Sequence, residues 1–559
     1  MSGNNPGISP AAADRGWEAH NPPAARSIPA WIVVALLALI GLAGVGMILR
    51  ATASGPGIGG DATIYLTSAR NLLAGKGLGL LNPDGTFRPL PYTPPLFPLL
   101  LSALGLFGLD LVQAARWLNA LLFGGTIWVA GAAVYRFTRQ AAIALLAAAL
   151  LMLSPVLVRV YSWAMAEPVF LFTGFLGLFL SVGYARRPGR ALLAGAALGC
   201  GLSFLARYIG AGFVGAAALV LLLLDRRGWL ARIRAALAFL GISLAPIAVW
   251  MAWDLWKTQT VASRSIQSPL GLGARLLSAF PPLKEDILFW LIPDTLEARL
   301  PHLLNNLIFL AGVVVLAALL AGVAWLSLSR RRLAAGELTG SASLVISLIL
   351  LAAVFIAGTL LVYVTTFPPI TLDNRMIVPL HVAALLLAAV LAGMLVRLET
   401  GRRWLVAGVW LVILGFTASY LYRTPRIANQ YGSAGLGYMM KEYQESDTIR
   451  AVKALPAGTQ IITNEITEVL YFTGRPSYAL LSGKTVDPGS PPAAYGSDPS
   501  DAGQAAFRDG AALVIFNTLP GSFQEIFGDQ GPARLAALTN GLYRAYSGSD
   551  GAIYYYLAP

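Results

Sequence analysis

Two acidic residues lie at the ends of apolar stretches, where a carboxylate can meet both water and lipid. Asp61 follows the apolar run 31–49 within "GGDATIYLTSARNLLAGKGL", and Glu167 opens another run in "YSWAMAEPVFLF". Either carboxylate could move a proton in a glycosyl or acyl transfer. Each also has a structural explanation. Asp61 could be the N-cap of the helix that follows it, and a glutamate at a helix start is favoured by the helix dipole.

Four arginines stand near the same kind of boundary. Arg207 interrupts "SFLARYIGAGF", Arg375 precedes "MIVPL", and Arg70 and Arg88 lie between the first two apolar runs. Because a guanidinium group stays charged and binds phosphate through two parallel hydrogen bonds, Arg207, Arg375 and Arg88 are candidate phosphate ligands. The alternative is an ion pair or a side chain that reaches the membrane surface, and Asp373 is a ready partner for Arg375.

Arg207 has apolar residues on both sides, so an anion should neutralise it. That anion is either a lipid phosphate or a carboxylate, and Glu167 is the acid expected nearest in space. We also assign Tyr65, Arg70 and Tyr208, which neighbour these charged residues in the sequence, as candidate substrate contacts.

Membrane helices must position these residues. The chain has 559 residues, of which 57% are hydrophobic and 12% charged, and its mean hydropathy is +0.67. Many separate apolar runs reach the length that spans a bilayer. The composition therefore predicts an α-helical polytopic membrane protein and excludes a soluble one.

The spacing of the apolar runs predicts about eleven spans. After the run 31–49 they are 112–135, 141–157, 167–185, 191–206, 210–224, 235–253, 303–328, 342–364, 376–396 and 404–421. Clusters of arginine fall near 136–139, 186–190, 226–234, 330–332 and 397–403. All these clusters lie on one side if the N-terminus is cytoplasmic and "PPLFPLLLSALGLF" is a surface helix that does not cross, as the positive-inside rule requires. We therefore expect a multi-pass protein of the cytoplasmic (cell) membrane.

This topology divides the chain into three parts. Residues 1–29 form a disordered cytoplasmic tail, 30–423 the transmembrane domain with its outer loop 51–111, and 424–559 an extracytoplasmic α/β domain. In the last part "TIRAVKAL" is helical, "TQIITNE" and "ALVIFN" resemble strands, and "YRAYSGSDGAIYYYL" predicts two strands around a turn.

Metal and nucleic-acid functions find little support. Cys200 is the only cysteine, and His20, His302 and His381 are the only histidines. An internal disulfide and a cysteine-ligated metal site are excluded, and a histidine-rich site is disfavoured. We assign no metal ligands, although a divalent cation stays open as a cofactor. The net charge of +13 sits in short loops, where membrane topology explains it, so no nucleic-acid partner is expected.

The segment "GDATIYLTSARNLLAGKGL…PYTPPLFPLLLSALGLFG" resembles the first outer loop of polytopic glycosyltransferases of the GT-C fold. The similarity is to the dolichyl-phosphate-mannose-protein mannosyltransferases and to the bacterial enzymes that transfer aminoarabinose to lipid A, the family 39/83-like group. The matching positions are Asp61, Tyr65, Ala69, Gly75 and Pro94-Pro95-Leu96. "LLMLSPVLVRVYSWAMAEPVFLF" is similar to the family's Ser-Pro…acid-Pro segment, with Glu167 at the second acidic position, and "TNEITEVLYFTGRPSYAL" to a segment of the outer C-terminal part of bacterial relatives.

Two positions depart from the family pattern. Ala62 stands where many relatives have glutamate, which weakens a metal site, and Thr93 stands where many have lysine or histidine before Pro-Pro. We therefore expect Arg88 or Arg207 to contact the donor phosphate.

The resemblance implies transfer of a hexosyl or pentosyl group from a polyprenyl-phosphate donor, at the outer membrane face, with inversion. Asp61 would deprotonate the acceptor hydroxyl, Glu167 would orient the acceptor or the base, and Arg207 and Arg375 would hold the phosphate. The sugar stays open, and the acceptor is a protein, a lipid or a polysaccharide.

Two other functions stay open at this point. One is a transporter or flippase for a lipid-linked sugar, since charges at membrane spans also mark transport routes. Against it, the charges lie at the outer ends of spans and no inverted repeat is evident. The other is a structural membrane subunit with an outer binding domain.

Overall fold

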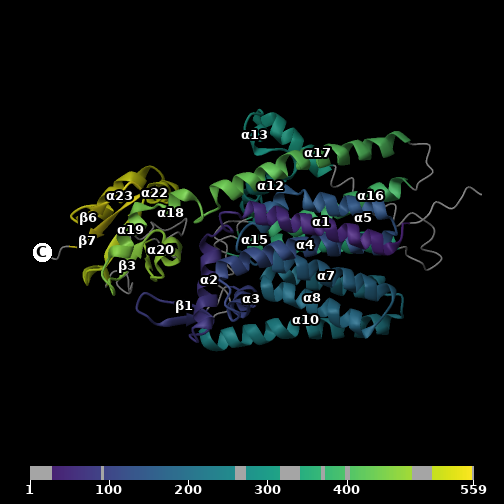
Figure 1. Ribbon diagram of the computed structural model, residues 1–559, viewed down its shortest axis with the longest axis horizontal. Coiled ribbons are helices and arrows are strands. Elements are labelled where there is room, and N and C mark those ends of the chain that lie inside the picture. Colours follow the sequence, from purple (N-terminus) through teal and green to yellow (C-terminus); the bar gives the residue numbers. More distant parts are fainter. Residues whose placement is uncertain are drawn as a thin grey trace, which may run out of the picture.

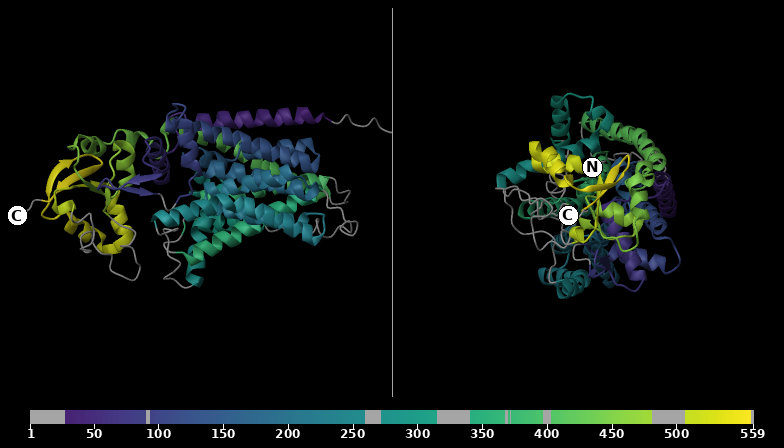
Figure 2. Two further views of the ribbon diagram at one scale, coloured as in Figure 1. Left: turned by 90° about the horizontal axis from the view of Figure 1, so that it is seen from below. Right: turned by 90° about the vertical axis from the view of Figure 1, so that its left-hand side faces the viewer.

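The computed structural model describes residues 28–89, 93–258, 272–314, 340–366, 370, 372–396, 403–480 and 506–556. Long helices lie side by side in a bundle, and a small α/β domain lies beyond one end of it (Figures 1 and 2). That end carries α2 (Gly60–Leu73), and we call it the α2 end.

Seven helices of the described chain are long and apolar enough to cross a membrane. They are α1 (Ala30–Ala51), α4 (Leu111–Thr138), α7 (Glu167–Arg186), α10 (Trp229–Thr258), α15 (Gly340–Thr365), α16 (Asn374–Val396) and α17 (Arg403–Ala434). An eighth span results if α5 (Ala141–Met152) and α6 (Pro155–Tyr161), which are bent by 56°, cross together. The chain is thus a multi-pass membrane protein, as predicted.

The predicted count of about eleven spans is not confirmed. The runs 191–206 and 210–224 form α8 (Arg190–Ala206) and α9 (Ala211–Leu224), of 17 and 14 residues. Both helices are shorter than the roughly 20 residues typical of a spanning helix, so length alone does not count them as spans. The run 303–328 extends beyond the described residues, and its described part is an apolar helix over His302–Val314.

Several short elements lie outside the long helices. They are α3 (Leu96–Gly105), η1 (Tyr208–Gly210), α11 (Leu272–Ser278), α12 (Phe280–Leu291), α13 (Asp294–Glu297) and the hairpin of β1 (Gly79–Leu81) with β2 (Phe87–Pro89). The ten-residue α3 confirms that "PPLFPLLLSALGLF" forms a helix too short to span. α2 ends at Leu73, and Gly75, just beyond the C-cap Ala74, has a φ of +72°, which few other residues adopt.

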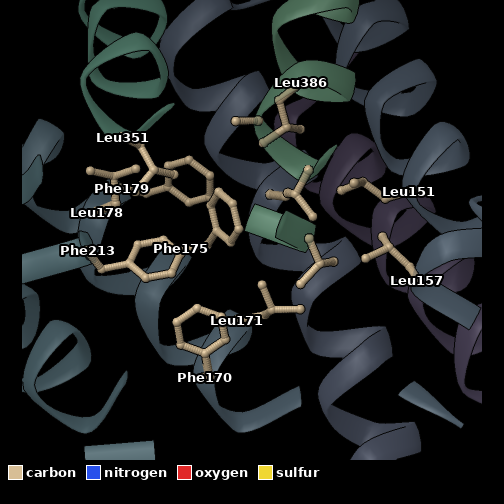
Figure 3. Close-up of a cluster of buried hydrophobic side chains, with 14 of the residues drawn as sticks. Leu151, Leu157, Phe170, Leu171, Phe175, Leu178, Phe179, Phe213, Leu351 and Leu386 are labelled. Atoms are coloured by element: carbon tan, nitrogen blue, oxygen red, sulfur yellow. The ribbon is translucent and has the colours of Figure 1, made fainter. Parts of the chain in front are cut away.

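An aromatic core fixes several helices of the bundle. Phe213 of α9 contacts Phe170 and Phe175 of α7 and Phe355 of α15, each edge-on at ring-centroid distances of 5.0–5.5 Å. Figure 3 shows Phe170, Phe175 and Phe213 together with leucines of neighbouring helices, Leu351 and Leu386 among them. Because Phe170 lies one turn after Glu167, this packing also fixes the start of α7.

The C-terminal domain is built on a five-stranded mixed sheet of order β4-β3-β5-β7-β6. Its elements are α18 (Lys441–Gln444), α19 (Asp447–Ala454), β3 (Ile461–Thr463), α20 (Ile466–Thr473), β4 (Tyr478–Ala479), β5 (Ala512–Phe516), α22 (Leu519–Phe527), η3 (Gly528–Gln530), α23 (Gly531–Thr539), β6 (Tyr543–Ser547) and β7 (Gly551–Tyr555). The helix, the two single strands and the final hairpin predicted here are confirmed. The boundary placed at 423 falls inside α17, which continues to Ala434.

Backbone hydrogen bonds tie the loop before α2 to two distant segments. Gly57 donates to the carbonyl of Ser162 (2.8 Å), and Tyr438 donates to the carbonyl of Ile58 (2.8 Å). At Gly437, where φ is +55°, a side chain would overlap the Ile58 carbonyl oxygen. The start of α2 is therefore held between the bundle and the C-terminal domain.

Candidate functional site

Asp61 lies in the first turn of α2 but does not cap it. The N-cap is Gly59, and no side chain caps this helix end, so the interpretation of Asp61 as the N-cap is wrong. The helix begins at Gly60, one residue before Asp61, and the carbonyl of Gly59 accepts its first hydrogen bond, from Thr63. The Asp61 carboxylate instead pairs with Arg375, with 3.3 Å between Oδ2 and Nη1.

Arg375 is held from its other side by Asp373. The Asp373 carboxylate accepts from Arg375 Nε (2.9 Å) and from the backbone N–H groups of Arg375 (3.0 Å) and Met376 (3.2 Å). Asp373 thus caps the first turn of α16 and aims the Arg375 side chain. The predicted Asp373–Arg375 pair exists, and it leaves the guanidinium free to reach Asp61 as well.

Glu167 and Arg207 form a second pair, which is more deeply buried than the first. The Arg207 Nη1 donates to Glu167 Oε1, and the Glu167 side chain is fully buried. Glu167 Oε2 is also buried and accepts no hydrogen bond from the described residues. The Arg207 Nη2 lies 3.7 Å from the sulfur of Met376. The structure therefore gives Arg207 the carboxylate partner that the sequence analysis named.

The packing of α7 against α8 brings this second pair together. Ser203 of α8 donates to the carbonyl of Phe170 in α7 (2.9 Å), and α8 ends there. Arg207 follows in extended backbone, with φ −148° and ψ 138°, before η1 begins. Glu167 does begin α7, where the helix dipole favours an acid, but its side chain is buried and not in contact with solvent.

Tyr65 lies between the two pairs. Its ring is 3% exposed and packs edge-on against Phe97, with centroids 5.3 Å apart. Burial raises the pKa of Tyr65, with Arg207 and Arg375 opposing and Glu167 and Asp61 reinforcing that rise. Tyr65 is thus within electrostatic range of all four charges, and its hydroxyl stays neutral at physiological pH.

A fourth acid of the site, Asp286, was missed by the sequence analysis. It lies on α12, a short helix that is not a candidate span, and its Oδ1 accepts from the side-chain amide of Asn374 in the first turn of α16. Burial, followed by the charge of Asp373, raises the pKa of Asp286 to about 7. The segment "PPLKEDILFW" gave no signal, because an acid in an amphipathic stretch ordinarily faces water.

The remaining candidates point elsewhere. Tyr208 lies beside Trp250 and near Asp254 of α10, an acid that is 1% exposed and was also missed. Arg70 is exposed at the opposite end of α2 from Asp61, near Tyr471 of α20. Arg88 lies on β2, which contacts α10.

The site therefore combines two arginines with four acids at the α2 end of the bundle. Arg207 is fixed by a buried acid, while Arg375 is 36% exposed and lies beside the 48% exposed Asp61. Such a site can hold an anion on two guanidinium groups and offer a carboxylate to a proton nearby. Among the described residues, no group of three or more His, Cys, Asp or Glu side chains is placed to hold a metal ion.

Comparisons with known proteins identify the fold. No family model and no curated protein matches the sequence. Among solved structures, ArnT from Cupriavidus metallidurans bound to undecaprenyl phosphate is similar with a TM-score of 0.56 and 14% identity, covering 94% of this chain and 97% of that one. The oligosaccharyltransferase AglB from Archaeoglobus fulgidus, in complex with an inhibitory peptide and a dolichol-phosphate, gives 0.54 and 12%, covering 94% and 74%. The chain has the GT-C fold of these membrane proteins.

Proposed function

We propose that this GT-C-fold chain is a membrane glycosyltransferase that moves a sugar from a polyprenyl-phosphate carrier to a hydroxyl acceptor. The observation that carries the proposal is the half-exposed Asp61–Arg375 pair next to the fixed Arg207. Two solved structures of the same fold are complexes with undecaprenyl phosphate and dolichol-phosphate. A lipid phosphate places its charge at the level of the headgroups, where the ends of spanning helices lie.

The reaction needs one proton acceptor and a place for the leaving charge. The acceptor oxygen forms a bond to the anomeric carbon from the face opposite the phosphate, and the bond from that carbon to the phosphate oxygen breaks. The configuration inverts, the acceptor proton passes to Asp61, and polyprenyl phosphate leaves. Arg375 and Arg207 stabilise the charge that develops on the leaving phosphate.

The site works on the outer face of the membrane in this proposal. It rests on the basic loops, which lie on one side if the N-terminus is cytoplasmic. The α2 end and the C-terminal domain are then extracytoplasmic. Reporter fusions after Arg227 and Lys453 should give opposite signals, and equal signals would refute this orientation.

The test is Asp61→Asn, assayed in membranes with radiolabelled polyprenyl-phosphate sugars. Loss of a general base typically lowers rates by about 10²–10⁴-fold, and we expect a fall of this size with normal amounts of folded protein. Asp529→Asn, at an exposed acid of the C-terminal domain, is the matched control and should retain full activity. Wild-type transfer by Asp61→Asn would remove Asp61 from the reaction, and absence of transfer by the wild type with any of these donors would oppose the proposal.

A further inference from the structure

The first turn of α16 connects four side-chain contacts of the site. Asp373 holds Arg375, Arg375 reaches Asp61, and Met376 contacts Arg207. Asn374, in the same turn, donates to Asp286. Asp286 therefore contacts the residue that directly precedes, in the chain, the arginine that we assign to the lipid phosphate.

The orientation of the Asn374 amide is fixed by chemistry. An indole N–H can only donate, and that of Trp290 donates to Asn374 Oδ1 (2.8 Å). The amide nitrogen must then face Asp286, which can accept from it whether the carboxyl group is charged or neutral. This contact holds Asp286 in place without requiring its charge.

Asp286 differs from the other acids of the site in its partners. Asp61, Glu167 and Asp373 each form a salt bridge with an arginine. Asp286 forms none within the described chain, and its Oδ2 is buried without a hydrogen bond from those residues.

The charges around Asp286 come from several elements. Asp373 and Glu285 disfavour its ionisation, and Arg159 of α6 favours it. Arg423 of α17 contacts the same helix through the ring and carbonyl of Phe289. Even when Arg159 is counted with Arg207 and Arg375, the four acids outnumber the three arginines, so an arriving phosphate adds negative charge to a site that already has an excess of it. A proton is the simplest compensation, and the acid without an arginine is the one to take it.

We propose that Asp286 takes up a proton when the anionic lipid phosphate binds, so that donor binding at this site is coupled to protonation. The identity of the ligand rests on the proposed function. Its charge disfavours a second negative charge nearby, and by linkage a neutral Asp286 favours the ligand. The midpoint lies in the physiological range because burial already raises the pKa of Asp286 to about 7. Donor affinity should then fall as the pH rises through neutrality.

The coupling can be measured with a ligand whose own charge does not change. The methyl phosphodiester of undecaprenyl phosphate carries one charge throughout pH 6–8, and calorimetry on the full-length protein in detergent gives its affinity. We expect binding about tenfold tighter at pH 6 than at pH 8, as for like charges roughly 10 Å apart at an effective dielectric constant of about 20. Repeating the titration at pH 7 in buffers of different ionisation enthalpy should show proton uptake.

Three variants separate this coupling from a structural role. Asp286→Asn keeps the shape and should bind the diester equally at both pH values, without proton uptake. Asp286→Glu should keep the pH dependence. Glu285→Gln, at the exposed neighbour on α12, is the matched control and should keep both the proton uptake and the pH dependence, with a midpoint slightly below that of the wild type because one negative charge near Asp286 is removed.

Each outcome decides the proposal. A wild type without proton uptake, or an Asp286→Asn protein with the wild-type pH dependence, overturns it. If Asp286→Asn does not fold, the wild-type and Asp286→Glu titrations still decide. A wild type that binds the diester with proton uptake yet transfers no sugar would leave the coupling in place and remove the proposed function. A wild type that does not bind the diester would overturn both.

Discussion

Two arginine–carboxylate pairs lie at the same end of the bundle in opposite surroundings. In the Arg207–Glu167 pair the acid is fully buried and the arginine 19% exposed, whereas in the Arg375–Asp61 pair the acid is 48% and the arginine 36% exposed. A buried charge that loses its partner has no water to replace it, while a half-exposed charge does. The first pair is therefore part of the framework, and the second is the pair that a substrate can open.

The largest effect should come from breaking the buried pair. Glu167→Gln leaves the Arg207 guanidinium without its counter-charge, and removal of one partner from a buried ion pair costs about 3–5 kcal/mol. We expect a large fall in the thermal midpoint of the purified protein and a smaller yield of folded protein. The double variant Glu167→Gln, Arg207→Gln should recover part of that stability. A Glu167→Gln protein as stable as the wild type would contradict the claim that the buried pair, unlike the exposed pair, stabilises the fold.

Changing the exposed pair should affect the donor and leave the fold intact. Arg375→Lys keeps a positive charge that still attracts phosphate but loses the planar fork that spans Asp61 and Asp373. We expect the donor KM to rise by about tenfold or more, with a thermal midpoint near that of the wild type, because half-exposed ion pairs contribute only about 0–1 kcal/mol. Arg375→Ala should raise the donor KM further.

Unchanged donor kinetics in a folded Arg375→Ala protein would remove Arg375 from the phosphate site. A protein that unfolds would instead show that the exposed pair, like the buried one, belongs to the framework.

The sequence identified the members of both pairs but not both pairings. Asp61, Glu167, Arg207 and Arg375 each interrupt an apolar pattern near the end of a run, and that signal is local. The partners are 40 and 314 residues apart in the chain, so the pairing depends on how α7 meets α8 and how α16 meets α2. Glu167 was named as one of two anions for Arg207, whereas the contact of Asp61 with Arg375 was not foreseen.

The features that the sequence did not predict, the burial of Asp286 and the number of spans, also have physical explanations. Asp286 belongs to an amphipathic helix, and its burial arises only when α12 packs near α6 and the start of α16. The span count relied on the length of apolar runs, and the helices α8 and α9, which two of these runs form, are shorter than the helices that count as candidate spans. The C-terminal strands were easier to predict, because alternating patterns and a Ser-Gly-Ser-Asp-Gly turn specify a hairpin locally.

The smallest effect should come from a buried acid that forms no salt bridge with an arginine among the described residues. Glu468 on α20 is 4% exposed, and burial, with the charges of Glu465 and Asp550, raises its pKa to about 8. The folded state then holds a proton that the unfolded chain releases near pH 4.5. Stability contributed by this group is lost as the pH rises from about 4.5 to 8, and the loss levels off above that.

Glu468→Gln keeps the shape and removes the titration, so it isolates this contribution. We expect the variant to match the wild type at pH 5 and to melt a few degrees higher at pH 9, measured as thermal midpoints of the full-length protein. Glu442→Gln, at an exposed acid of α18, is the control and should shift neither midpoint. A Glu468→Gln protein that is less stable at pH 9 would mean that the charged carboxylate has a partner after all, and that burial without an arginine does not set the behaviour of acids in this molecule.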